Sequence, residues 1–185
     1  MTLGLFGGAF DPPHRGHVEL VTRAKEALGL DRVVVLVSAV PGHKRVETPA
    51  AARLELARAA FPEDEVVLDG HGRTVDALRE HPEWEGAVFM IGADEFCDFL
   101  TWKEPEEVLR RVRLAVATRP GFPQERLDAV LARLSDPERV TFFEIEPMPV
   151  ASRDLRSRLE DGEDVSGQIP PAVAETIRRE RLYGA

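Results

Sequence analysis

The stretch LGLFGGAFDPPHRGH, residues 3–17, decides the fold class of this chain, because a strand-like and a helix-like pattern meet within it. Leu3 to Phe6 predicts a first strand, closed by Gly7-Gly8. From His17 to Leu28 apolar residues recur near helical spacing and Gly29 follows them, so a helix is expected there. A strand that passes through a glycine turn into a helix is the opening unit of an α/β fold.

The rest of the chain repeats this alternation. Further strands are expected at Arg32 to Ser38, Val66 to Leu68, Ala87 to Ile91, Arg113 to Ala117 and Thr141 to Ile145, and further helices at Pro49 to Ala60, Thr74 to His81, Ser152 to Leu159 and Pro171 to Arg181. The pattern predicts a Rossmann-like open parallel sheet flanked by helices, in a single domain over residues 1–185. Ligands of such sheets bind beyond the carboxyl ends of the strands, so the residues after each strand are the candidates for a site.

Composition limits the partners of the chain. The 185 residues include 24 basic and 33 acidic side chains, a net charge of −9, which makes a poor surface for DNA or RNA. The longest apolar run, Val33 to Val37, is far shorter than a membrane span. The single cysteine, Cys97, excludes an internal disulfide and a cysteine-built zinc site. We therefore expect a cytoplasmic protein with no nucleic-acid or membrane partner, and the sequence leaves a homo-oligomer open.

The loop after the first strand carries the clearest chemical signal. His14 and His17 stand at the mouth of the first predicted helix, where free N–H groups and the positive end of the helix dipole favour a phosphate. Imidazoles there can donate hydrogen bonds to phosphoryl oxygens. A helix-capping loop and a metal pair are the alternatives, and the metal pair lacks a third ligand at a helpful spacing. The loop therefore predicts a phosphate site without a protein-built metal site.

Residues 7–17 resemble the GGxFDPxHxGH signature of the HxGH nucleotidyltransferases, and in particular the nicotinate mononucleotide adenylyltransferase family. Similarity to the family's other motifs extends over nearly the whole chain: Val40-Pro41-Gly42-His43-Lys44, Gly72 to Leu78, Gly92-Ala93-Asp94, Trp102, Arg119-Pro120-Gly121-Phe122, Val150 to Arg156, and a closing helix from Ile169 to Tyr183.

The resemblance implies transfer of the adenylyl group of ATP to nicotinate mononucleotide, giving nicotinate adenine dinucleotide and pyrophosphate in NAD biosynthesis. It implies ATP and nicotinate mononucleotide as substrates and Mg²⁺ as cofactor, held mainly by the ATP phosphates. The alternatives are a sister adenylyltransferase that acts on nicotinamide mononucleotide or phosphopantetheine, a cytidylyltransferase, and a nucleotide-binding sensor without turnover.

The same resemblance assigns roles to individual residues. It implies catalysis by His14, His17, Lys44 and Arg156. It places ATP against Gly7, Gly8, Ala9, Phe10, His14, His17, Gly92, Asp94, Ser152 and Arg156. It places the mononucleotide against Lys44, Thr74, Trp102 and Arg119.

Several of these residues have a second interpretation. Asp94 can take a ribose hydroxyl pair or cap a short helix, and Trp102 can stack on the pyridine ring or belong to the core. Arg156 is expected at the start of a helix, an unfavourable place for a cation unless it reaches an anion. The chain departs from the family motifs where Ser152 is the single hydroxyl of its segment and where Arg73 replaces an aromatic residue.

Overall fold

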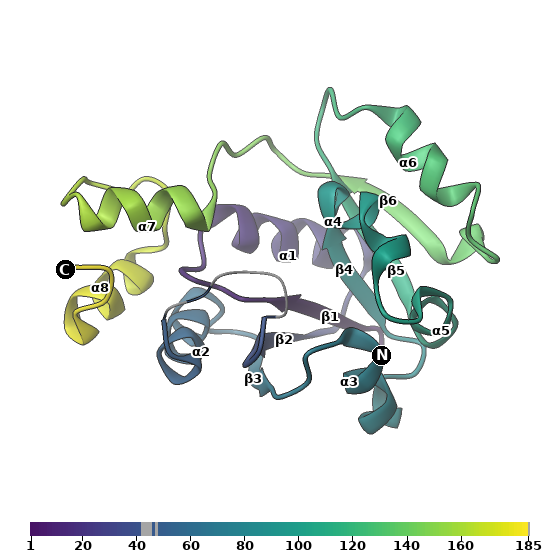
Figure 1. The fold of residues 1–185 in the computed structure, drawn as a ribbon, viewed down its shortest axis with the longest axis horizontal. Coiled ribbons are helices and arrows are strands. Elements are labelled where there is room, and N and C mark those ends of the chain that lie inside the picture. The colour runs from purple at the N-terminus through teal and green to yellow at the C-terminus, as the bar shows by residue number, and fades with distance from the viewer. Residues whose placement is uncertain (42–45, 47, 185) are drawn as a thin grey trace.

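The computed structural model describes residues 1–41, 46 and 48–184 and contains one six-stranded sheet, in the order β3-β2-β1-β4-β5-β6 (Figure 1). All neighbouring strands pair in parallel. The strands are β1 (Leu3–Gly8), β2 (Arg32–Ser38), β3 (Glu65–Asp69), β4 (Val88–Gly92), β5 (Arg113–Thr118) and β6 (Val140–Glu144). The chain builds outward from β1 to one edge, returns to β4, and builds outward to the other edge, so the strand order reverses between β1 and β4.

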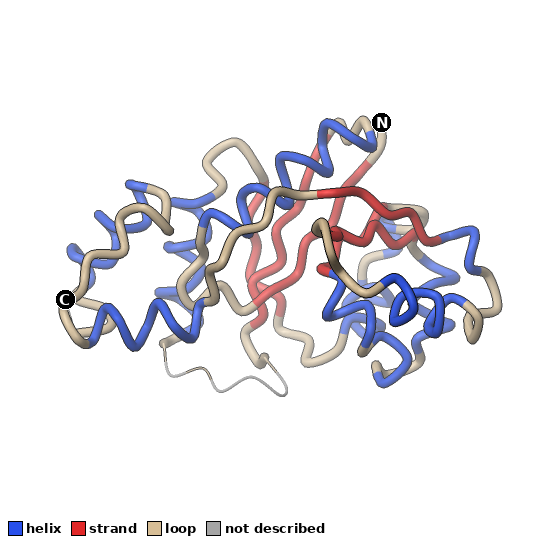
Figure 2. Tube along the Cα trace, turned by 90° about the horizontal axis from the view of Figure 1, so that it is seen from above, coloured by secondary structure: helices blue, strands red, loops and turns tan. Residues whose placement is uncertain are grey.

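Helices cover both faces of the sheet, as Figure 2 shows from above. One face carries α1 (Arg15–Leu28), α2 (Ala50–Ala60), α7 (Ser152–Glu160) and α8 (Pro171–Glu180). The other carries α3 (Thr74–Glu80), α4 (Ala93–Cys97), α5 (Pro105–Arg111) and α6 (Gln124–Leu131), with 3₁₀ turns at Pro82–Trp84, Phe99–Thr101 and Pro137–Arg139. The predicted Rossmann-like parallel sheet flanked by helices is therefore confirmed.

Each face of the sheet packs against its helices in a separate hydrophobic core. Each central strand contributes side chains to both of these cores, because successive side chains point to opposite faces. In β2, Val33, Val35 and Val37 pack under α1 and α2, whereas Val34 and Leu36 face α3. All five are at most 4% exposed. Burial on both faces explains why this strand has an unbroken apolar run and not an alternating one.

The predicted strands and helices lie within two residues of the observed ones. One boundary is wrong in a way that matters: β1 continues through Gly7 and Gly8, which pair with Leu36 and Val37 and do not close the strand. Helix α1 also begins at Arg15, with His14 as its N-cap, and not at His17. The sequence patterns did not indicate α5 and α6, and they indicated α4 only as a short helix for Asp94 to cap.

A buried arginine on α2 joins the ends of the two central strands. Arg53 is 1% exposed. Its guanidinium donates to the carbonyl oxygens of Ala9 and Ser38, both at 2.8 Å, and of Thr48 at 3.0 Å. Burial lowers the pKa of Arg53, and the charge of the nearby Asp11 opposes that change. One cation thus satisfies three carbonyls from the segments that follow β1 and β2.

Replacing Arg53 by methionine should destabilise the fold by about 3 kcal/mol or more, because it keeps an apolar side chain of similar length but leaves three buried carbonyls without their donors. Urea unfolding followed by circular dichroism measures the change. Arg58→Met on the same helix is the control, since the Arg58 side chain is 54% exposed and pairs with the exposed Glu55 at 2.7 Å. Equal unfolding midpoints for the two variants would contradict the prediction.

No helix in the described part of the chain is long and apolar enough to cross a membrane.

Candidate active site

The candidate site lies where β1 and β4 end side by side. Phe6 pairs with Met90 in parallel, so the segments after Gly8 and Gly92 leave neighbouring strands at the same edge of the sheet. The first segment leads to α1 on one face and the second to α4 on the other. This divergence is the crevice in which α/β sheets bind their ligands.

The turn after β1 is made by Phe10 and not by the glycines. Phe10 has a φ of 52°, in the left-handed region, and its side chain is 1% exposed. Its ring lies against Gly8, where an added Cβ would come within 2.9 Å of Cζ. Gly8 is therefore required to admit the ring. The prediction that Phe10 contacts ATP is corrected for its side chain, which belongs to the core, and only its backbone is left for a ligand.

His14 and His17 form one stacked unit at the start of α1. Their rings lie 3.7 Å apart at an angle of 25°. The backbone N–H of His14 donates to Nδ1 of His17 at 3.1 Å, so a neutral His17 carries its proton on Nε2. Between them, a Cβ on Gly16 would come within 3.1 Å of Nδ1 of His14. A side chain at position 16 would therefore press against the ring of His14, which explains why a glycine stands between the two stacked histidines.

His14 is neutral at physiological pH. It is 9% exposed, and burial lowers its pKa to about 4. Its Nδ1 atom has no hydrogen-bond partner among the residues that the structure describes. A neutral imidazole can donate one hydrogen bond, and an arriving anion would favour its protonation.

Fewer backbone donors are free at the start of α1 than the sequence suggested. The N–H of Arg15 donates to the carbonyl of Gln168 at 2.9 Å, and the N–H of His17 donates to that of His14 at 2.9 Å. The first turn of α7 offers a second set of backbone donors. The N–H groups of residues 152–154 make no hydrogen bond within the described part of the chain. The imidazoles and α7 are therefore the larger source of donors.

Helix α7 is tied to the same loop by two side chains. The Ser152 hydroxyl donates to the carbonyl of Pro12 at 2.9 Å, and Nη1 of Arg156 donates to the carbonyl of Asp11 at 2.6 Å. Arg156 is the fifth residue of α7, so the expectation that it stands at the helix start is wrong, and the argument from the helix dipole does not apply to it. Its remaining N–H groups can still reach an anion, since a guanidinium carries five donors.

Asp94 and Arg119 meet after β4 and β5. Oδ2 of Asp94 is 3.5 Å from Arg119, and Oδ1 is 3.7 Å from Arg126. Both guanidinium groups lie over the ring of Phe122, at 5.9 and 5.3 Å from its centroid. Asp94 is the second residue of α4, whose N-cap is Gly92, so of its two interpretations the helix cap is not supported.

Thr74 and Trp102 lie on adjoining segments. Asp76, two residues after Thr74 in α3, pairs with Lys103, which follows Trp102, at 2.8 Å. The indole of Trp102 is half-buried and packs edge-on against Phe99 at 5.3 Å. One edge of the ring therefore joins the core while the rest is accessible, and stacking on a pyridine ring stays a prediction. Lys44 lies outside the described residues.

Sequence reasoning missed three residues that hold the site together: Arg53, Asp11 as a side chain, and Tyr183. A buried arginine has no sequence pattern of its own, and the same helix carries one other arginine, Arg58, which is exposed. Asp11 was present in the recognised motif but was given no role. The hydroxyl of Tyr183 donates to Oδ1 of Asp11 at 2.6 Å, a contact across 172 residues that no local pattern reveals.

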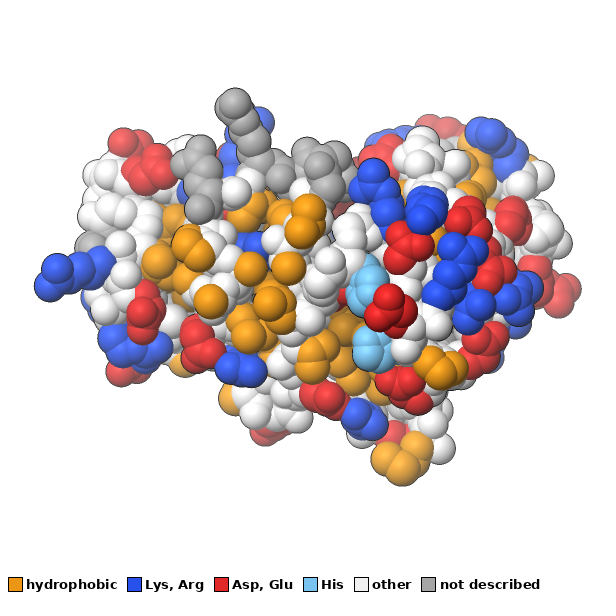
Figure 3. Space-filling view, turned by 60° about the horizontal axis from the view of Figure 1, so that its bottom comes forward, with side chains coloured by type: hydrophobic (Ala, Val, Ile, Leu, Met, Phe, Trp, Pro, Cys, Tyr) orange, Lys and Arg blue, Asp and Glu red, His pale blue; other side chains and the backbone are white. Residues whose placement is uncertain are grey.

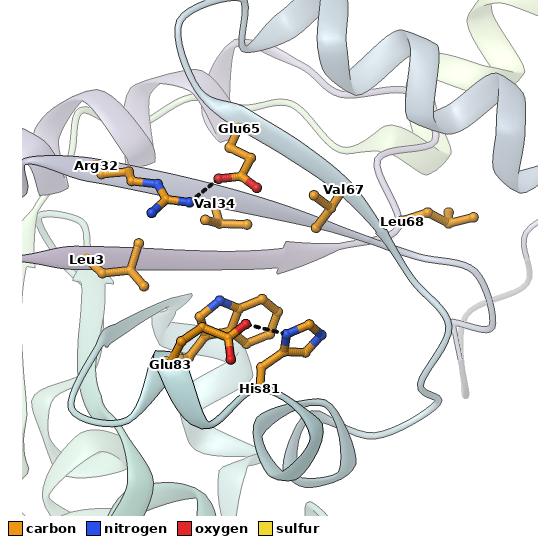
Figure 4. Close-up of a pocket in the computed structure, with 9 residues that line it drawn as sticks. Leu3, Arg32, Val34, Glu65, Val67, Leu68, His81 and Glu83 are labelled. Carbon is orange, nitrogen blue, oxygen red and sulfur yellow. Dashed lines mark hydrogen bonds and ion pairs between the residues drawn. The ribbon is translucent and has the colours of Figure 1, made fainter.

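A cavity of about 270 Å³ lies at the other end of the sheet, between the beginnings of β1 to β3 and Trp84 (Figure 4). Its charged groups pair with one another, Arg32 with Glu65, and His81 with Glu83 at 2.7 Å. Since it faces the amino ends of the strands, it is separate from the histidines.

Charges of both signs are interspersed over the face of the molecule in Figure 3. No group of three His, Cys, Asp or Glu side chains within the described ranges is arranged to hold a metal ion.

Comparison with known proteins identifies the family. Residues 5–164 match the model of the cytidylyltransferase-like family. A probable nicotinate-nucleotide adenylyltransferase of Rubrobacter xylanophilus is 36% identical over 100% of this chain and 93% of its own length. One from a strain of Thermus thermophilus is 38% identical over 99% of this chain and its whole length. The chain belongs to the nicotinate-nucleotide adenylyltransferase family.

The fold of the family is seen in a solved structure of Plasmodium falciparum nicotinic acid mononucleotide adenylyltransferase in complex with NaAD. It superposes on this chain with a TM-score of 0.80 at 18% identity and covers 99% of this chain and 97% of the other. The same enzyme complexed with APC has a TM-score of 0.77. These likenesses confirm the nucleotidyltransferase architecture, and the resemblance inferred from the HxGH motif is confirmed by the relatives.

The buried His14 should make the stability of the fold fall in acid. Its pKa is about 4 in the folded chain and about 6.5 in an unfolded one, so the unfolded state binds more protons between these values. Up to about 3 kcal/mol of stability should be lost as the pH falls through that interval. Urea unfolding at several pH values measures it. The variant His14→Gln should lose this part of the acid sensitivity, and the variant His81→Gln, which changes a surface histidine, should keep it. Identical pH profiles of stability for the wild type and both variants would show that His14 is not the group responsible.

Proposed function

We propose that this chain transfers the adenylyl group of ATP to nicotinate mononucleotide, with release of pyrophosphate. The observation that carries the proposal is the stacked pair of His14 and His17, held at the switch point of the sheet with the tautomer of His17 fixed. Two neighbouring imidazoles on a rigid helix start are suited to phosphoryl oxygens. Membership of the nicotinate-nucleotide adenylyltransferase family supports the choice of both substrates.

The ATP phosphates would lie between the starts of α1 and α7. His14, His17 and Arg156 supply the side-chain donors, and the opening N–H groups of α7 supply backbone donors. The adenosine would run toward Gly92 and Asp94 past the backbone of Gly7, which is exposed, and of Gly8 and Ala9, which are half-buried. Ser152 would contact a phosphate only if its hydroxyl turned away from Pro12, so we assign the contact of that residue to its backbone N–H.

The transfer needs no general base. The phosphate of the mononucleotide is already ionised at pH 7 and attacks the α-phosphorus of ATP in line while the bond to pyrophosphate breaks. Catalysis then consists of holding two anions in line and stabilising the charge that develops on the α-phosphoryl oxygens. Nε2–H of His17 donates to one of these oxygens, and His14 and Arg156 act on the leaving pyrophosphate.

A divalent metal would complete the ATP complex, as nucleotidyltransferases generally use one. Mg²⁺ usually keeps several waters and binds substrate phosphates. We therefore assign it to ATP, in keeping with the described residues, which present no carboxylate and histidine cluster for it. Bound there, it neutralises charge on the phosphates.

The mononucleotide would bind between α3 and the segment of Trp102. The accessible edge of the indole is suited to the pyridine ring, and Thr74 at the start of α3 to the carboxylate. Lys44 and Arg119 are proposed to contact its phosphate and ribose side. The ion pair of Asp76 with Lys103 keeps the two walls of this pocket together.

Pyrophosphate release from ATP, measured in parallel with several acceptor phosphates, tests the function. Nicotinate mononucleotide should be preferred over nicotinamide mononucleotide by roughly thirtyfold in kcat/KM, since charge-assisted hydrogen bonds to its carboxylate have no counterpart in the amide. Phosphopantetheine and the absence of an acceptor are the controls. Equal rates with both pyridine nucleotides would indicate dual specificity, and no release with any acceptor would indicate a nucleotide-binding sensor.

His17→Ala should lower kcat by at least a hundredfold and leave ATP affinity within a few-fold of wild type. A donor used mainly in the transition state affects turnover far more than ground-state binding, and removing one such donor costs about 3 to 4 kcal/mol. Steady-state kinetics and ATP titration measure the two effects. A variant that keeps more than about a tenth of wild-type kcat would show that His17 is a structural cap.

A further inference from the structure

The end of the chain returns to the loop that carries the histidines. The hydroxyl of Tyr183 donates to Oδ1 of Asp11 at 2.6 Å, and Asp11 is only 3% exposed. The other carboxylate oxygen, Oδ2, has no hydrogen-bond partner in the described part of the chain, and Nη1 of Arg156 is 3.7 Å from it. Tyr183 is therefore the only side chain in the described residues that satisfies the buried carboxylate by a hydrogen bond.

The backbone of the loop is held from the same side. Arg156 and Ser152 of α7 bind the carbonyls of Asp11 and Pro12, so both anchors come from the last quarter of the chain, as does Tyr183. His14 follows Pro12 by two residues and is the N-cap of α1. A shift of Asp11 would consequently move the N-cap of that helix and the two stacked rings attached to it.

The conformation at the end of α8 is arranged to bring the phenol to this place. Arg181 and Tyr183 have φ values of 53° and 54°, in the left-handed region that costs free energy for residues with a side chain. The N–H of Leu182 donates to the carbonyl of Ile177 at 3.0 Å and turns the chain back over the helix end. In Figure 1 α8 lies beside α2 at one end of the molecule, and the two helices are in contact. Two of these three consecutive residues thus adopt an unfavourable backbone conformation. This indicates that the contact of Tyr183 stabilises the chain by more free energy than that conformation costs.

We propose that Tyr183 is a positioning residue of the site, which acts through Asp11 to hold His14 and His17 in place for the transfer. This rests on the proposed function for its effect on turnover. Burial raises the pKa of Tyr183, the hydrogen bond to Asp11 adds to the rise, and a hydrogen bond with Thr48 opposes it, so the phenol stays protonated and remains a donor. Thr48 follows β2, and Tyr183 therefore touches the segments after both central strands.

Tyr183→Phe separates positioning from packing, because it removes the hydroxyl and keeps the ring. We expect kcat to fall about tenfold while the KM for ATP changes less than threefold, since the loss of one hydrogen bond to a charged group is sufficient for that factor. Thr176→Val is the matched control. Thr176 also lies on α8, is 4% exposed, and donates its hydroxyl within the helix, to the carbonyl of Ala172 at 2.9 Å.

A second measurement does not depend on turnover. NMR titration of the imidazole of His14 should give a pKa near 4 in the wild type and in Thr176→Val, and a value nearer 6.5 in Tyr183→Phe, because a displaced loop exposes the ring. Unfolding midpoints are measured first to confirm that both variants fold.

The outcomes are distinguishable. A lower kcat together with the shifted titration of His14, in Tyr183→Phe alone, supports the positioning role. An unchanged titration of His14 in Tyr183→Phe overturns it, whatever the activity, and so does an equal loss of kcat in the Thr176→Val control. If the wild type releases no pyrophosphate with any acceptor, the proposed function fails, while the titration still decides whether Tyr183 holds the histidine loop.

Discussion

The parallel pairing of β1 with β4, with Phe6 beside Met90, sets the geometry on which the rest of this structure depends. The chain leaves these neighbouring strands toward opposite faces, to α1 and to α4, and a crevice forms because no connection crosses between them. Both strands end in glycine, at Gly8 and Gly92, where the missing side chains leave room for the ring of Phe10 and the carboxylate of Glu95. The start of α7 meets the histidine loop here, since Ser152 and Arg156 bind the carbonyls of Pro12 and Asp11.

The loop at the crevice is held by polar contacts that reach it from distant parts of the chain. Arg53 binds it from α2, Arg156 and Ser152 bind it from α7, and Tyr183 binds it from the end of α8. Each contact satisfies a backbone carbonyl or a carboxylate that would otherwise be buried without a partner. Preorganisation of a phosphate site depends on such support, because donors that must first be ordered lose the energy that they would give to the transition state.

Burial also sets the electrostatics of the site within a chain of net charge −9. A protonated pair of histidines would attract ATP in the ground state as strongly as in the transition state. The buried His14 is instead neutral, with a pKa of about 4, and the N–H of His14 determines which nitrogen of His17 carries the proton. A neutral His14 adds no charge that would strengthen ground-state binding, and a donor of fixed direction on His17 would favour the oxygen on which charge grows during transfer, which is the requirement for a higher kcat.

The sequence by itself determined the α/β class, the order of strands and helices, and the position of the site after β1, because these depend on apolar periodicity and on a compact motif. It also indicated the family, since the HxGH segment and the motifs after the later strands are short and local. It could not determine where the glycines of β1 stop pairing, or that Phe10 turns inward, because both depend on the space left by neighbouring strands. The partners of Asp11 were equally hidden: Tyr183 is 172 residues away, and only the packing of α8 against α2 brings its hydroxyl to the loop. The local sequence pattern indicates which backbone conformation a segment prefers. Hydrogen bonds between distant segments form only once the sheet and its helices have assembled, and the same is true of the burial that lowers the pKa of His14.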